Sequence, residues 1–152
     1  MATSGGGGRD IARLVRDQHE EIRRLCAEVP SCQGDERRAA FSALVVLLDE
    51  HEAVEARTVH PVVRTADVLG ARIVADSARE SGRARRLLSA VERVGVDSDE
   101  FPPRFAVLRD AVLRHAENEE RTVLPLLERA PGIDDLDCLA VVVGRARPSP
   151  DP

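Results

Sequence analysis

Apolar side chains recur at intervals of three and four along most of this chain, and Pro or Gly residues interrupt the pattern in a few places. This spacing puts the apolar residues on one face of an α-helix. The interruptions divide the pattern into four long helices joined by short connections, over residues 9–29, 35–64, 67–94 and 101–129. The sequence therefore predicts an all-α fold, an antiparallel up-and-down four-helix bundle over residues 9–130.

The two ends of the chain differ in composition from this central part. Residues 1–8 contain a run of Gly, which predicts a flexible N-terminus. Residues 131–152 carry a short apolar stretch and then repeated Pro. They predict a short helix over about 133–143, where Val141 to Val143 also has a weak strand pattern, followed by a disordered tail.

Composition excludes several classes of function. The chain has 22 Lys+Arg, all of them Arg, against 27 Asp+Glu, and this net charge of −5 disfavours a surface for nucleic acid or anionic membrane. It has no Tyr and no Trp, which excludes a tyrosyl radical, a phenolate ligand and an aromatic platform for bases. No segment has the apolar length of a membrane span and no signal peptide is recognisable, so we expect a cytoplasmic protein.

Three cysteines, Cys26, Cys32 and Cys138, lack the spacing of a zinc site. Cys26 and Cys32 are close enough in sequence to form a local disulfide under oxidising conditions. In a reducing compartment we expect free thiols instead.

Imidazoles and carboxylates interrupt the apolar faces near the middle of three helices. His19, His51 and His115 each stand in such a position, and Glu55 and Glu119 follow the last two at i+4, which keeps them on the same face. A buried imidazole or carboxylate is costly unless it is paired or coordinated. Nitrogen and oxygen ligands together suit iron, manganese or zinc, and two His–Glu pairs suggest two ions bridged by carboxylates.

Each of these residues also has a simpler interpretation. A single inward His is commonly a hydrogen-bonded core residue, and a Glu one turn later is commonly the partner of an Arg. Three central His and two Glu at matching levels of one bundle favour the metal site over these separate explanations.

The third helix has no His. Its predicted apolar face has Glu80 in the middle, where it serves either as a metal ligand or as the partner of an Arg, and it has Asp76 one turn earlier. The full predicted face is Leu69, Ile73, Asp76, Glu80, Ala84, Leu87, Val91 and Val94. Small residues near Glu80 either leave space beside the metal site or allow ordinary close packing between helices. Close packing is the favoured interpretation. These small residues are Ser77, Ser81, Gly82 and Ala84.

The fourth imidazole, His60, lies five residues after Glu55 and therefore off the ligand face of a regular α-helix. We expect it at the rim or behind the ligands, with direct ligation as the alternative. Pro61 and Pro125 follow Glu55 and Glu119 at the same distance, so we expect a kink near each Pro. This shared pattern indicates that the second and fourth helices are corresponding halves of a repeat.

Three segments, 17–21, 51–61 and 115–125, resemble the hemerythrin-like, or HHE cation-binding, domain. The resemblance covers about residues 9–129. It implies a non-haem di-iron centre, oxo- or hydroxo-bridged, inside an up-and-down bundle, with zinc or manganese as possible substitutes. The implied ligands are His19, His51, Glu55, His115 and Glu119, with the two Glu as bridges. Glu52 matches a position that is a ligand in some members.

The chain departs from the family pattern on the third helix, where Ser81 stands at the position that usually holds His. Either Glu80 replaces the imidazole, or the second iron keeps an open position, or the site binds one metal weakly. A carboxylate there makes the centre more negative and favours the ferric state. That change favours peroxide chemistry or oxidation over reversible oxygen carriage.

Three functions are compatible with these features. The first is a module that binds oxygen, nitric oxide or iron, for sensing, storage or protection. The second is a non-haem di-iron oxidoreductase acting on a small substrate, which requires a pocket at the metal larger than a diatomic molecule needs. The third is a domain with a vestigial metal site that contacts a partner, with the apolar residues 136–143 as the interface.

Overall fold

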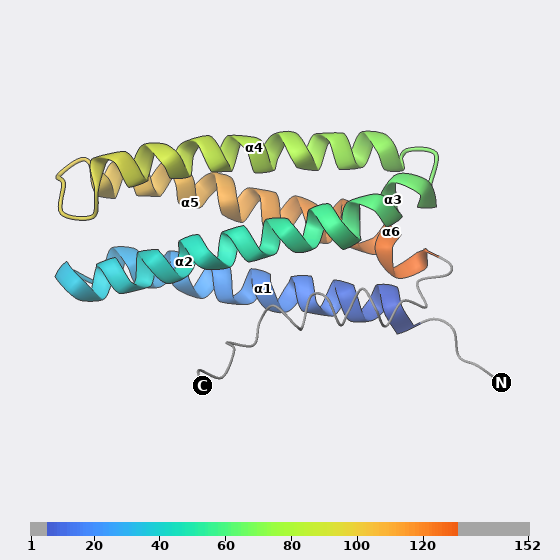
Figure 1. The fold of residues 1–152 in the computed structure, drawn as a ribbon, viewed down its shortest axis with the longest axis horizontal. Helices are drawn as coiled ribbons and strands as arrows, with labels where there is room; N and C mark the ends of the chain where they lie inside the picture. The colour runs from blue at the N-terminus through green and yellow to red at the C-terminus, as the bar shows by residue number, and fades with distance from the viewer. Residues whose placement is uncertain (1–5, 131–152) are drawn as a thin grey trace, which may run out of the picture.

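The computed structural model describes residues 6–130, and in this range the chain forms four long helical rods (Figure 1). The second and fourth rods each contain a short π-helical turn, labelled η. The elements are α1 (Gly6–Ser31), then α2 (Gly34–Val54), η1 (Glu55–Val59) and α3 (His60–Ala66), then α4 (Gly70–Val94), and finally α5 (Phe101–Asn118), η2 (Glu119–Val123) and α6 (Leu124–Arg129). The predicted all-α bundle of four long helices is confirmed.

Short connections fold the rods against one another. Figure 1 shows the chain reversing direction at each connection, so that α1 lies beside α2 and α4 lies beside α5. Gly95 ends α4 with φ of 79°, a conformation that favours glycine. Asp67 makes the turn before α4, where its carboxylate accepts the N–H of Leu69 at 2.8 Å and its carbonyl accepts the N–H of Gly70 at 3.0 Å.

Two helix starts differ from the sequence prediction by three residues. Residues 6–8, expected to be flexible, are helical and Gly8 is buried, since packing of a helix face can override the low helix propensity of Gly. The third rod begins at Gly70 rather than at residue 67, because Asp67 is committed to the turn. The predictions for residues 131–152 and residues 1–5 lie outside the described residues. No helix within residues 6–130 is long and apolar enough to cross a membrane.

The core consists of two apolar clusters separated by a polar layer. One cluster surrounds three rings, with centroids 5.3 Å apart for Phe41 and Phe101 and 5.6 Å apart for Phe101 and Phe105. The other cluster packs the opposite half of the bundle and includes Val15 and Leu127. Along each of the first, second and fourth rods, the buried imidazoles and carboxylates lie between these clusters.

The predicted inward face of the third rod is correct in part: Val91 is buried, and Ile73, Ala84 and Leu87 pack against the apolar clusters. The most buried positions otherwise lie one residue further along. The buried residues of α4 are Gly70, Val74, Ser77, Leu88 and Val91. Asp76 is exposed and forms an ion pair with Arg79 at 2.7 Å. The inward face of α4 near the polar layer consists of small side chains, which give no apolar signal in the sequence.

Candidate metal centre

Three rods bring five buried side chains together in the polar layer. His19 comes from α1, His51 from the end of α2 and His115 from α5, while Glu55 and Glu119 are the first residues of the two π-turns. Four of these residues each offer one ligand atom within 4.8 Å of all the others: His19, His51, Glu55 and Glu119. The fold therefore gathers residues that are far apart in the sequence into one cluster.

Each carboxylate lies between imidazoles. Glu55 Oε1 lies 2.7 Å from His51 Nε2, while Glu55 Oε2 lies 3.8 Å from Nε2 of both His115 and His60. Glu119 Oε1 lies 2.5 Å from His115 Nε2 and 3.6 Å from His51 Nε2. Glu119 Oε2 lies 3.7 Å from His19 Nε2. Both carboxylates are thus placed to join two groups of nitrogen ligands.

Many of these buried atoms have no hydrogen-bond partner in the part of the chain that the structure covers. They are Nε2 of His19 and His60, both ring nitrogens of His115, Oε1 of Glu55 and both carboxylate oxygens of Glu119. The close contacts of Glu55 Oε1 with His51 and of Glu119 Oε1 with His115 are ion-pair distances without hydrogen-bond geometry. Buried polar atoms in folded proteins are nearly always paired, because each unpaired one costs about 1–3 kcal/mol. A set of convergent nitrogen and oxygen atoms without donors fits a metal ion as the common partner.

Neighbouring side chains fix the orientation of two imidazoles. Nδ1 of His19 lies 2.9 Å from Oε1 of Glu120, whose carboxylate also accepts two bonds from Arg23 at 3.0 and 2.9 Å. Nδ1 of His51 lies 2.9 Å from Oε1 of Gln18. Because these oxygens accept, each Nδ1 carries a proton and each Nε2 faces the cluster, as in metal-ligating histidines.

Gln18, Arg23 and Glu120 belong to the site, although the pattern of the sequence did not predict them. The only signal was that Gln18 and Glu120 are adjacent to ligand candidates in the sequence. Their role depends on contacts between rods, such as that from residue 120 to residue 19, which periodicity does not predict.

Burial and mutual contact shift the ionisation of the cluster. Burial, with the nearby His51, lowers the pKa of His19 to about 4. Burial also opposes the charged forms of His51 and His115. Their contacts with Glu119 and Glu55 outweigh burial, so the pKa of His51 is raised to about 9 and that of His115 to about 10. Burial and the adjacent Glu55 raise the pKa of Glu119.

The two carboxylates are therefore unequal. Burial alone would raise the pKa of Glu55, but its contacts with Glu119, His115 and His51 hold that pKa well below its usual range. Burial also lowers the pKa of His60, which keeps that ring neutral. The layer combines an ionised Glu55 with His19 and His60, whose pKa values are lowered and whose Nε2 atoms have no partner among the described residues. Carboxylate oxygen and imidazole nitrogen are ligand types of a cation site.

Two predicted ligand candidates lie outside the cluster. The Glu80 side chain is 33% exposed, accepts a hydrogen bond from Asn118 Nδ2 at 2.7 Å, and stands 4.0 Å from Nδ1 of His115. It lies on the Nδ1 side of His115, away from the Nε2 that contacts Glu119, and Ser81 beside it lines the neighbouring cavity. Glu52 forms an ion pair with Arg85 of α4.

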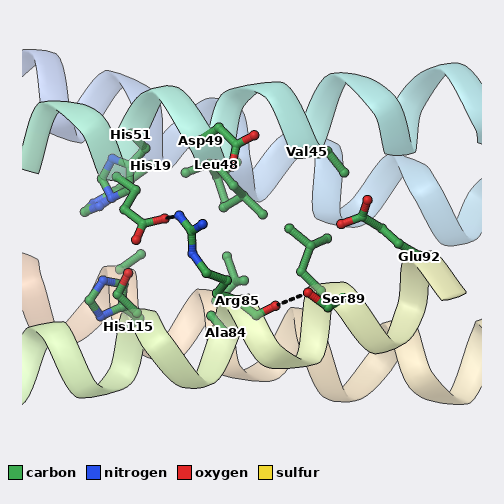
Figure 2. A pocket seen from close by; sticks show the side chains of 16 residues that line it. His19, Val45, Leu48, Asp49, His51, Ala84, Arg85, Ser89, Glu92 and His115 are labelled. Atoms are coloured by element: carbon green, nitrogen blue, oxygen red, sulfur yellow. Dashed lines mark hydrogen bonds and ion pairs between the residues drawn. The ribbon is translucent and has the colours of Figure 1, made fainter.

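A cavity of about 190 Å³ adjoins the cluster between α2 and α4. Figure 2 shows His19, His51 and His115 at one end of it and Glu92 at the other, with Arg85 extending from α4 toward α2. Ser81 and Ala84 are among its lining residues. Ala84 also packs against an apolar cluster and Ser77 is buried, so the small residues of α4 take part in close packing as well as bordering this space.

The sequence pattern of the hemerythrin HHE cation binding domain matches residues 10–127. No curated protein and no solved structure matches the chain significantly. The family match covers all four rods and every member of the cluster. Together with the His–Glu layer, it shows that this chain belongs to the hemerythrin HHE cation-binding domain family.

Proposed function

We propose that this protein binds a pair of non-haem iron ions in its His–Glu layer and uses them to bind or sense oxygen or nitric oxide, or to handle iron and peroxide. The residues that would hold the ions are His19, His51, Glu55, His115 and Glu119. The observation that supports this most strongly is the convergence of buried nitrogen and oxygen atoms that have no hydrogen-bond partner among the described residues.

The ligand chemistry supports iron and a pair of ions. Mixed imidazole and carboxylate ligands suit iron, with manganese and zinc as substitutes. Both Glu55 and Glu119 have imidazoles near each of their two oxygens, as bridging carboxylates require. Bound iron supplies a redox-active centre with affinity for oxygen, nitric oxide and peroxide. The chain contributes oriented imidazoles and an apolar cluster on either side of the layer.

Binding is the favoured function because the cavity offers few groups for acid–base work. Glu52 and Arg85 neutralise one another, and Glu92 and Asp49 are exposed carboxylates on the lining. The imidazoles at the inner end are committed to the cluster. A small neutral ligand needs only space and a metal, both of which this arrangement can provide.

The size of the cavity favours a second candidate, a non-haem di-iron oxidoreductase that acts on a small organic substrate. A cavity of about 150 Å³ in another protein holds benzene, and the one beside the three imidazoles here measures about 190 Å³. It therefore has more space than a diatomic molecule needs.

Anaerobic loading with ferrous iron, followed by oxygen, distinguishes these functions. Because the chain has no Tyr and no Trp, absorption bands of ferric iron stand out against a weak protein background. Bands that disappear when oxygen is removed support binding, whereas irreversible oxidation or sustained peroxide consumption supports the enzyme. The variant His51→Ala/Glu55→Ala is the control and should give no bands. Failure of the native chain to bind iron would contradict both functions.

A further inference from the structure

His60 is placed on the ligand side of its rod by the π-turn that precedes it. In an α-helix, a residue five positions further on points about 140° away from the first. In η1 the N–H of His60 donates to the carbonyl of Glu55, so these two residues stand one above the other across the wider turn. The π-turn thus removes the reason to expect His60 at the rim.

The side chain of His60 lies beside Glu55 and has an unused nitrogen. Its Nε2 is 3.8 Å from Glu55 Oε2, and the side chain is only 14% exposed. This Nε2 is buried and makes no hydrogen bond to any residue between 6 and 130. Such an atom is costly to bury unless a further partner accepts its lone pair.

The second half of the repeat shows that packing alone does not require an imidazole here. Residues 119–125 repeat the pattern of residues 55–61, and Leu124 stands where the first half has His60. Leu124 is fully buried in an apolar cluster that also includes Val59 and Val63. A branched apolar side chain therefore suits this position in the fold.

The distances divide the nitrogen ligands into two groups around the carboxylates. Glu55 Oε1 is close to His51, and His19 and His51 belong to the tight four-residue cluster. Glu55 Oε2 is equally distant from His60 and His115. On α4, Glu80 Oε2 lies 4.0 Å from Nδ1 of His115, and residues 70–94 of this helix include no imidazole.

We propose that His60 is a metal ligand through Nε2, and that it completes with His115 the nitrogen ligands of the second ion on the Oε2 side of Glu55. This inference rests on the proposed function. In this arrangement, His60, which follows the π-turn of the second rod, supplies an imidazole ligand, whereas α4 has no His to supply one.

Iron content tests the assignment. Native protein, His60→Leu and the control Arg57→Leu, which removes an exposed polar side chain from the same π-turn, are loaded anaerobically with ferrous iron, desalted and assayed. We expect the iron content of His60→Leu to fall to half that of the native chain, while Arg57→Leu keeps the native content. Full iron content and an unchanged spectrum in His60→Leu would overturn the assignment while leaving the proposed function intact.

Two further results keep the test decisive. If His60→Leu does not fold, judged by circular dichroism of the metal-free chain, His60→Gln takes its place with the same expected loss. If the native chain itself binds no iron, the proposed function fails and the assignment fails with it.

Discussion

Gln18 and Glu120 determine which nitrogen of two imidazoles faces the metal centre. Each accepts from an Nδ1–H at 2.9 Å, so each Nε2 is left facing the cluster. Glu120 is itself held by the two-bond contact with Arg23. Residues behind the ligands commonly contribute to metal affinity in this way, through orientation and ligand basicity.

Removal of the carboxylate behind His19 should weaken iron binding without removing a ligand. We expect Glu120→Ala to lower iron affinity about 10- to 100-fold, measured by competition with a chelator. Glu117→Ala is the control, because Glu117 is an exposed carboxylate on the same rod. Equal iron affinities in the two variants would show that the contact of Glu120 with His19 Nδ1 does not contribute to iron affinity.

The two cysteines in the described part of the chain should differ in reactivity. Both are free thiols, Cys26 buried and Cys32 half-buried. Burial raises the pKa of Cys26 to about 11, so at pH 8 only about one Cys26 thiol in a thousand is the reactive thiolate. We expect iodoacetamide to modify Cys32 in the folded protein and Cys26 only after unfolding, as read by peptide mass mapping. Similar rates for both in the folded chain would contradict the buried position of Cys26.

At the scale of the element, the sequence predicted the position of each kink but not its form. Pro cannot donate a backbone hydrogen bond and crowds the preceding turn, which explains why Pro61 and Pro125 indicate an irregularity. The structure realises it as a π-turn in both rods. The hydroxyls of Thr58 and Thr122 also donate hydrogen bonds to the carbonyls of residues 54 and 118. Such bonds compete with the regular backbone hydrogen bonds of the α-helix and often bend it.

This difference explains what sequence reasoning missed at the site. The interval from His51 to Glu55 lies almost wholly within α2, so α-helical spacing placed both correctly on one face. The interval from Glu55 to His60 spans the π-turn, where α-helical spacing gives the wrong direction. On α4 the inward Ser77 and Ser81 carried no apolar signal, and Glu80 was assigned to the inward face in their place.

The junction of α3 and α4 depends on a residue without a side chain. A Cβ at Gly70 would lie 2.0 Å from the carbonyl oxygen of Val63, which is backbone and cannot move aside easily. We expect Gly70→Ala to reduce the free energy of unfolding by about 1–3 kcal/mol or more, measured by urea denaturation of the metal-free chain.

Gly82→Ala on the same helix is the matched control for Gly70→Ala. The nearest atom to its added Cβ would be Arg86 Nη1 at 3.7 Å, an ordinary contact with a flexible side chain. Because Gly disfavours helices, this change should stabilise the protein by about 0.5–1 kcal/mol. If both variants lost stability equally, the close approach at Gly70 would not be the cause.

At the scale of the whole molecule, a polar layer holds together two apolar halves. One cluster surrounds Phe105 and the other includes Leu127, and His19, His51 and His115 stand at the level between them. The four rods and most of this layer follow from periodicity and from the cost of burying imidazole and carboxylate. The supporting contacts between rods do not, because they depend on the packing of residues distant in sequence.

A metal ion in this layer should stabilise the whole bundle. Any ligand that binds only the folded chain raises its free energy of unfolding, by about 2.7 kcal/mol at a hundredfold excess over Kd. We therefore expect ferrous iron to raise the melting temperature of the native protein under anaerobic conditions. The variant His51→Ala/Glu55→Ala should show no such rise, and an equal rise in both would place the bound metal elsewhere.

The most direct test of this account is the mass of the folded chain after anaerobic loading with ferrous iron. Native mass spectrometry counts the ions on each chain, with the metal-free protein and His51→Ala/Glu55→Ala measured beside it. The account predicts two iron ions on the native chain and loss of this occupancy in the double variant. A native chain that carries no iron, or a double variant that keeps both ions, would contradict the assignment of the His–Glu layer as the metal centre.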